Sequence, residues 1–395
     1  MLALLCGLVV GAWFFGQGQA VRLRVAAGQR PNSRAPYHGA LCAAAAATAS
    51  LCGWLVALAV GAGSAPQLLA VVLPGVLAAG VAGRLAGPGA RARERAEGLA
   101  RLGLLAAASL SLVITLGITL ALVVEAALFF GEVSVLEFVL GTQWSPQTAL
   151  RPGQAGADGR FGAVPVFAGT FLIAAVGVGL AAPVGVMIAI YLSEYASARG
   201  RAVLKPLLEV LTGIPPVVYG VFALSAVGPV VRRAGATLGL DVPVQSALAA
   251  GVAMALMILP LVSSLSDDVI SAVPQDLRDG STALGATRSE TVRGVILPRA
   301  LPGVAGAVLL AAGRAIGETM IVVIVASRAA VLTANPLESV TTVTVQIVAL
   351  LTGDPVFDSA KTRAAFALGL ALFLLTLALN AAALLAARRF RARAR

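Results

Sequence analysis

Long apolar runs constrain what this chain of 395 residues can fold into more than any other feature. A helix needs about 20 mostly apolar residues to cross a bilayer. Nine such runs occur, at residues 2–16, 40–62, 66–83, 102–130, 164–191, 204–230, 244–266, 300–327 and 364–387. Only 12% of the residues are charged, whereas a soluble domain carries about 25%. The sequence therefore predicts an all-α polytopic membrane protein and excludes a soluble enzyme, a disordered chain and a nucleic-acid-binding protein.

The run at residues 2–16 is the shortest and has two interpretations. A secretory signal peptide would carry a basic segment before its apolar core. Here the basic residues follow the apolar core, which favours a membrane anchor.

Lysine and arginine residues are distributed unequally over the loops. Most of the 29 lie in the loops after the odd-numbered runs, such as residues 17–39 and 84–101, and in the C-terminal tail. Cytoplasmic loops of membrane proteins are enriched in these residues. The distribution predicts an N-terminus outside and a C-terminus in the cytoplasm, which agrees with an odd number of spans.

A Gly-Pro-Gly segment and a basic run divide the chain. Residues 1–90 are rich in alanine and contain no Asp or Glu, and they are interpreted as an accessory N-terminal transmembrane module. Residues 91–101 are interpreted as a basic cytoplasmic linker. The other six runs form a second transmembrane domain, residues 102–390, with long outer loops at 131–163 and 328–363. The second of these loops is predicted to be partly re-entrant.

The cytoplasmic loop at residues 267–299 has the pattern of a helix–turn–helix elbow. Pro274 can begin a helix, and Gly285 interrupts it. Thr287 and Glu290 have the spacing of a capping box, which predicts a second short helix that the next proline ends. Such an elbow can dock into the groove of a partner or lie as an amphipathic segment at the membrane surface.

Two charged residues, Arg314 and Glu318, fall inside the run at 300–327. Charges at that depth are costly and mark a pathway or an ion pair. The two residues are four apart, which predicts that they share a helical face and are close enough to pair. Gly313 and Gly317 form a G-x-x-x-G step that allows close helix approach. Because an arginine can also bind a phosphate oxyanion in a bidentate manner, a substrate pathway and a structural ion pair both stay open.

Pro215 and Pro216 interrupt the run at 204–230 and predict either a hinge beside a cavity or a plain kink. The chain has one histidine, His38, and three cysteines, all in apolar runs. Neither a metal site nor a cofactor is therefore expected.

At the elbow the sequence resembles the permeases of binding-protein-dependent ABC importers, whose loop reads E-A-A, three residues, G, nine residues, I-x-L-P. Here Gly285 stands at the glycine, Val295 at the isoleucine, and Leu297-Pro298 closes the motif. Asp279-Gly280-Ser281 replaces E-A-A and keeps only its acidic charge. In that family the loop is a coupling helix that inserts into a separate ATPase subunit. The resemblance implies an ATPase-coupling surface made of Asp279, Gly280, Ser281, Gly285, Ala286, Val295, Leu297 and Pro298.

The string G-R-A-I-G-E-T-M at residues 313–320 is similar to that of phosphate-importer permeases. Further similar stretches are Leu140–Trp144, Phe161–Pro165, Pro183–Tyr195 and Gly213–Gly220. The resemblance covers about residues 100–390 and implies a six-span ABC importer permease core with about three extra N-terminal transmembrane helices. In that family the arginine and the glutamate of this string are associated with phosphate passage, which implies a substrate pathway with Arg314 and Glu318, and the adjacent Thr319 is assigned to it. The predicted packing or hinge positions are Gly313, Gly317, Pro215 and Pro216.

The function that the resemblance implies is the permease subunit of an ATP-driven importer of inorganic phosphate in the bacterial inner membrane. No G-x-x-x-x-G-K-[ST] motif occurs, so the chain is expected to be non-catalytic, with ATP hydrolysed by a partner. The expected partners are a homologous second permease subunit, two copies of an ABC ATPase subunit, an extracytoplasmic phosphate-binding protein and the lipid bilayer. The alternatives are a permease for another oxyanion, the sister phosphate permease subunit, and a self-powered secondary transporter, which would usually show internal repeats.

Overall fold

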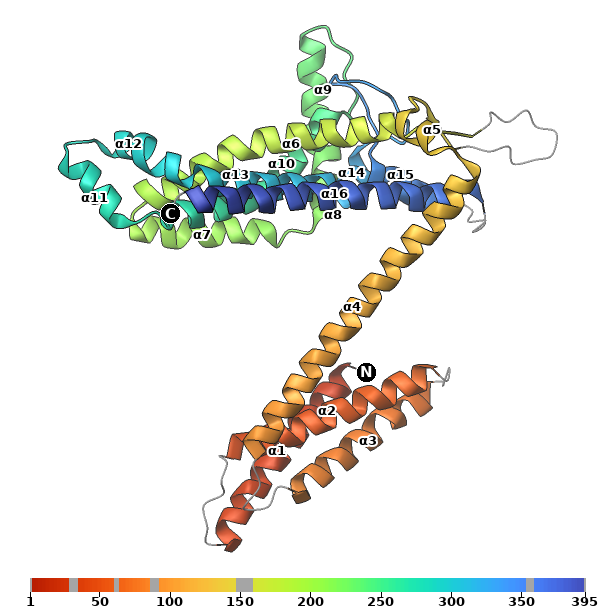
Figure 1. The fold of residues 1–395 in the computed structure, drawn as a ribbon, viewed down its shortest axis with the longest axis vertical. Coiled ribbons are helices and arrows are strands. Elements are labelled where there is room, and N and C mark those ends of the chain that lie inside the picture. The colour runs from red at the N-terminus through yellow and green to blue at the C-terminus, as the bar shows by residue number, and fades with distance from the viewer. Residues whose placement is uncertain are drawn as a thin grey trace, which may run out of the picture. The chain divides into compact units, whose positions relative to one another are not determined.

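The computed structural model of the protein describes residues 2–27, 35–59, 64–85, 92–146, 159–352 and 359–393. The chain divides into two compact units, Met1–Ile118 and Thr119–Arg395 (Figure 1). The boundary lies inside one long helix, α4 (Ala92–Glu132). The predicted basic linker is therefore helical from Ala92 onward, as its alanine and leucine content favours.

The first unit contains α1 (Leu2–Ala27), α2 (Ala35–Ala59), α3 (Ser64–Leu85) and the first part of α4. The first three helices pack against one another at small residues. A Cβ on Gly39 would lie 2.6 Å from a ring carbon of Trp13, so α1 and α2 can approach this closely only at a glycine. The three predicted N-terminal runs coincide with α1, α2 and α3, which confirms three additional helices. That these helices cross a membrane stays a prediction.

The second unit is a helical bundle with one short hairpin. In the hairpin, β1 (Trp144–Ser145) and β2 (Arg160–Phe161) pair antiparallel, with Trp144 opposite Phe161. Besides the end of α4, the helices are α5 (Val135–Leu140), α6 (Val164–Ile190), α7 (Ala198–Thr212), α8 (Pro216–Phe222), α9 (Gly228–Thr237), α10 (Ala247–Ser271), α11 (Gln275–Ala283), α12 (Arg288–Thr291), α13 (Leu297–Ile316), α14 (Met320–Val325), α15 (Val343–Leu351) and α16 (Ala360–Arg393). Three π-helical segments, η1 (Tyr191–Tyr195), η2 (Ala223–Val227) and η3 (Val292–Ile296), interrupt the α-helical pattern.

Six helical segments among the described residues are long and apolar enough to cross a bilayer, which confirms the predicted number of spans in the core. They are Ala96–Glu132, Val164–Tyr195, Pro216–Thr237, Ala247–Ser271, Arg288–Ile316 and Ala360–Ala382.

The predicted run at 204–230 was wrong in its boundaries. Its first part belongs to α7, a helix that carries four charged side chains and buries no residue, and the apolar segment begins only at Pro216. Pro215 takes an extended conformation (φ −59°, ψ 137°), and Pro216 opens α8. Because a residue before proline is pushed out of the helical region, the chain breaks here instead of bending within one span.

The run at 300–327 is not one helix either. Its spanning segment begins at Arg288 and ends at Ile316. Pro298 lies in the first turn of α13, directly after η3, so the prediction that Pro298 ends the second helix of the elbow was wrong. A π-helical segment shifts the hydrogen-bond register, and proline is tolerated in a first turn because its nitrogen need not donate there.

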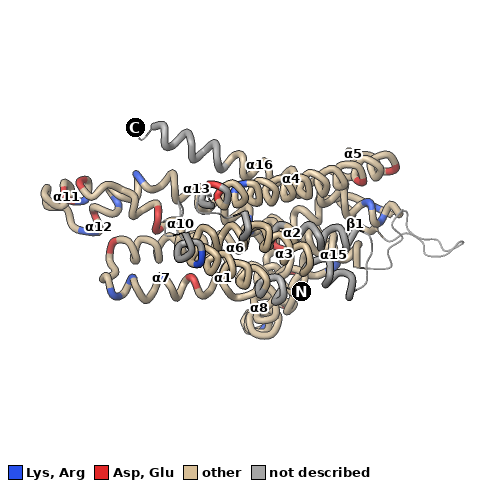
Figure 2. Tube along the Cα trace, turned by 90° about the horizontal axis from the view of Figure 1, so that it is seen from below, with Lys and Arg blue, Asp and Glu red and all other residues tan. Residues whose placement is uncertain are grey.

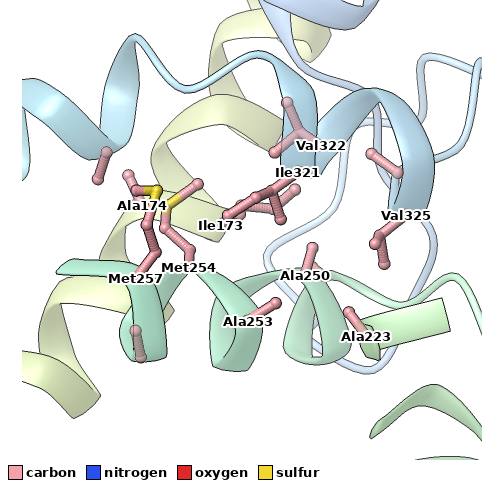
Figure 3. Packing of buried hydrophobic residues seen from close by; sticks show 14 of the residues in the cluster. Ile173, Ala174, Ala223, Ala250, Ala253, Met254, Met257, Ile321, Val322 and Val325 are labelled. Carbon is pink, nitrogen blue, oxygen red and sulfur yellow. The ribbon is translucent and has the colours of Figure 1, made fainter. Parts of the chain in front are cut away.

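Helices α6 and α10 form the centre of the second unit. Their buried side chains make one apolar cluster with α14 (Figure 3), which includes Ile173, Ala174, Ala250, Ala253, Met254, Ile321 and Val322. A Cβ on Gly185 would lie 2.8 Å from Cγ1 of Val262, and one on Gly251 would lie 2.4 Å from Cγ1 of Val176. Glycines at these two places, about 66 residues apart in sequence, let α6 and α10 pack closely over much of their length.

Candidate functional site

The second unit has charged elements at one end and the hairpin at the other. The elbow, which we define as residues 272–291 from the end of α10 through α12, lies at the end opposite α5 and the hairpin (Figure 1). Basic and acidic residues mark α7, α11 and α12 (Figure 2). The residues singled out by the sequence fall in two places, a cavity beside α7 and the elbow itself.

The cavity has a volume of about 240 Å³ and lies between α7, the start of α8, α10 and α13. Apolar side chains form most of its wall. The polar and charged residues that line it are Lys205, Glu209, Thr212, Ser264, Asp267 and Arg314. Of the predicted pathway residues, Arg314 lies here and Glu318 does not.

Arg314 reaches the cavity from the last turn of α13 and is exposed there. Within the part of the chain that the structure describes, its guanidinium has no ion pair and no hydrogen bond. A guanidinium has five N–H donors, and here all of them are available to a ligand or to water.

Glu318 lies outside α13, so the prediction that it shares a helical face with Arg314 was wrong. Helix α13 ends at Ile316, before Glu318 is reached. The Oε1 atom of Glu318 accepts hydrogen bonds from the backbone N–H groups of Met320 at 3.0 Å and Ile321 at 3.4 Å, at the start of α14. Its backbone carbonyl accepts a hydrogen bond from Thr344 Oγ1 at 2.9 Å. Hydropathy did not register this break because both sides of it are apolar.

The other residues of the segment 313–320 lie around the break between α13 and α14. A Cβ on Gly313 would lie 3.1 Å from Oδ1 of Asn380 on α16, so this glycine marks a close approach of α13 and α16. Gly317 is the C-cap of α13, and Thr319 precedes α14. The predicted break at Pro215 and Pro216 is spanned by Tyr219, whose hydroxyl donates to the carbonyl of Leu211 at 2.9 Å.

Asp267 is a charged residue of the cavity wall that was not among the site residues predicted from the sequence. Its side chain is 1% exposed, and it accepts hydrogen bonds from Arg201 Nη2 at 3.0 and 2.9 Å and from Lys205 Nζ at 3.1 Å. Two cations thus compensate the cost of burying one carboxylate. The hydrogen bond to Asp267 and the attraction of that carboxylate raise the pKa of Lys205 above its ordinary value, against the opposing effect of partial burial.

One signal in the sequence could have indicated part of this arrangement. Arg201 and Lys205 are four residues apart, which places them on one face of a helix. Their partner lies 66 and 62 residues further along the chain, and no local pattern predicts that contact.

The elbow follows the predicted design more closely, although it is shorter than the predicted loop at 267–299. Pro274 is the N-cap of α11, and Gly285 has a φ of +86°, a conformation that favours glycine. The capping box is confirmed: Thr287 N donates to Glu290 Oε2 at 2.7 Å, and Glu290 N donates to Thr287 Oγ1 at 3.4 Å.

The predicted coupling residues are divided between the elbow and the helix that follows. The side chain of Asp279 accepts a hydrogen bond from Gln275 Nε2, and Ser281 Oγ lies 2.9 Å from Thr291 Oγ1. Gly280 faces open space, Ala286 is half-buried beside Gly285, and Val295, Leu297 and Pro298 belong to η3 and α13. At the tip, Leu284 is 91% exposed.

Within the described residues there is no group of three or more His, Cys, Asp or Glu side chains that could hold a metal ion.

The part of the chain that contains the cavity and the elbow is similar to known transport proteins. Residues 181–395 match the family described as "binding-protein-dependent transport system inner membrane component". This region contains all residues that line the cavity and the whole elbow, whereas residues 1–90 lie outside it.

Three relatives show the range of similarity. The Bacillus subtilis protein named "Probable ABC transporter permease protein YqgH" is 34% identical over 244 residues, which cover 62% of this chain and 75% of that protein. The phosphate transport system permease protein PstC of Mesorhizobium japonicum is 31% identical over 289 residues, covering 69% of this chain and 84% of that protein. The phosphate transport system permease protein PstA 1 of Mycobacterium tuberculosis is 36% identical over 151 residues, covering 38% and 46%. The resemblance to phosphate-importer permeases is confirmed.

Proposed function

We propose a substrate and a mechanism for this chain from one premise, which is that it belongs to the family of binding-protein-dependent transport system inner membrane components. The proposed role is the permease subunit of an ATP-driven importer that carries inorganic phosphate across the bacterial inner membrane. The observation that carries the proposal is Arg314, a cation without an ion pair among the described residues, in a cavity of about 240 Å³.

The charges around the cavity suit a phosphate oxyanion. Arg314 offers a planar set of donors that can hold two oxygens of one phosphate. Lys205 lines the same cavity on a flexible stem and supplies a second positive charge. Asp267 keeps its contacts with Arg201 when Lys205 turns toward the substrate, so no buried carboxylate is left unpaired. Glu318, which caps α14, acts on the pathway only through the position of the break.

The energy for transport comes from separate ATPase subunits in this proposal. The elbow, with Leu284 exposed at its tip, docks into a groove of an ATPase subunit and moves when ATP is bound or hydrolysed. A second permease subunit, two ATPase copies and an extracytoplasmic phosphate-binding protein complete the importer. The elbow and the C-terminal end of α16 then face the cytoplasm, and the N-terminus lies outside, as the distribution of basic residues predicts.

Two alternatives keep the same architecture. The similarity to a PstA protein as well as to a PstC protein leaves the sister position in a two-permease importer as the second candidate. Transport of sulfate or molybdate would use the same cations with another oxyanion.

The test is uptake of labelled phosphate by vesicles that contain the whole importer. Arg314→Gln is expected to lower uptake by about 10-fold or more, because hydrogen bonds to charged groups contribute about 1.5–3 kcal/mol. Arg233→Gln, which removes an exposed arginine of α9 outside the cavity, is the matched control. Uptake of sulfate in preference to phosphate, or unchanged phosphate uptake by Arg314→Gln, would contradict the proposal.

A further inference from the structure

Arg278 joins the elbow to two spanning segments at once. Its Nη2 and Nε atoms donate to Glu194 Oε1, at 2.9 and 3.2 Å. Nη2 also donates to the carbonyl of Ile270 at 2.8 Å, and Nη1 donates to the carbonyl of Val273. We call this set of contacts the Arg278 clamp.

The clamp links three separate elements. Arg278 lies on α11, the first helix of the elbow. Glu194 lies in η1, the π-helical end of the α6 span, and Ile270 lies in the last turn of α10. One guanidinium therefore connects the elbow, α6 and α10.

The clamp is well shielded and its charges are compensated. The side chains of Arg278 and Glu194 are 14% and 9% exposed. Glu194 also accepts a hydrogen bond from Ser193 Oγ at 3.0 Å. A charged pair with little access to water holds its geometry much more firmly than an exposed pair, because its bonds have few competitors.

Helices α6 and α10 connect the clamp to the cavity. They pack closely at Gly185 and Gly251, so a shift at their shared end moves both helices. Five residues of the cavity wall belong to α10, namely Met257, Pro260, Leu261, Ser264 and Asp267, and Leu192 of η1 lines it as well. The clamp is thus connected through packed helices to the cavity that Arg314 also lines.

We propose that Arg278 is a positioning residue that transmits the movement of the elbow to α6 and α10 and so couples ATP hydrolysis to opening of the cavity. The proposal rests on the proposed function, since it assumes that an ATPase moves the elbow. Apolar packing of Leu277 against the same elements fixes the elbow in place but is not directional. The hydrogen bonds of the clamp depend on direction, so they add a directional link between the elbow and the two helices.

The experiment measures phosphate transported per ATP hydrolysed in vesicles that contain the whole importer. Arg278→Met is expected to keep ATP hydrolysis within about 2-fold of the unaltered importer while phosphate moved per ATP falls about 5-fold or more. Arg278→Lys keeps the charge but cannot reach one carboxylate and two carbonyls together, so an intermediate ratio is expected. Arg299→Gln, an exposed arginine of α13 with no hydrogen bond or ion pair to a described side chain, is the control and keeps the full ratio.

A merely structural role gives a different result. In that case assembly, ATP hydrolysis and uptake fall in the same proportion, and the ratio is unchanged in both Arg278 variants, which overturns the proposal. If Arg278→Met does not assemble, Arg278→Lys and Glu194→Gln give the ratio instead. An unaltered importer that hydrolyses ATP without moving phosphate contradicts the proposed function and not the clamp, which is then tested on the oxyanion that is transported.

Discussion

Arg278 and Arg314 belong to the same unit and have opposite surroundings. Arg278 is 14% exposed and donates to a carboxylate and two carbonyls, whereas Arg314 is exposed in a cavity and has no ion pair with a described residue. A guanidinium whose donors are used holds the protein together, and one whose donors are open can bind a ligand. This difference is the basis for the two roles that we propose, mechanical linkage for Arg278 and substrate contact for Arg314.

The contrast between Arg278 and Arg314 is tested most directly by replacing each arginine with methionine and measuring unfolding in detergent. Arg278→Met is expected to lower the free energy of unfolding by about 3 kcal/mol, because Glu194 is left nearly buried without its cation. Arg314→Met is expected to change it by less than about 0.5 kcal/mol, as for an exposed residue without contacts. Equal losses in the two variants would remove the distinction.

A smaller effect is expected at Asp267, which resembles Arg278 in being fully paired. Asp267→Asn keeps the size of the side chain but removes the charge that holds Arg201 and Lys205, and should cost about 2 kcal/mol of unfolding free energy. The cost is smaller than for Arg278 because each cation side chain is about a third exposed and can turn to water. Asp268→Asn is the matched control, since its side chain is 64% exposed. An equal effect of the two substitutions would show that burial of Asp267 is unimportant.

The smallest effect is expected in the elbow, where the capping box supports the clamp. Glu290→Ala removes the acceptor of the Thr287 N–H and should lower local stability by about 1 kcal/mol. Amide hydrogen exchange across residues 286–292 measures this local opening, with Ser289→Ala as the control. Unchanged protection of these amides in Glu290→Ala would mean that the capping box does not stabilise the start of α12.

The accuracy of the sequence-based predictions depended on the range of the contacts. Thr287 and Glu290 are three residues apart, so the pattern that predicts their capping box also contains both partners. The six spans were predicted because each is a continuous apolar segment. The break at Pro215 was predicted from its two adjacent prolines, whereas the break at Gly317 was missed because hydropathy reports burial in lipid and carries no information on where a helix ends.

The sequence by itself determined the class of the protein, the six apolar spans, the elbow and the resemblance to a permease family, since these depend on composition and short-range spacing. Only the tertiary structure decided which charges are paired. Arg278 meets Glu194 across 84 residues and Arg201 meets Asp267 across 66, whereas Arg314 and Glu318, four residues apart, do not pair. The reason is physical: a charge in a low-dielectric bundle is stabilised by whichever partner the packing of helices brings to it, and that packing joins residues distant in sequence.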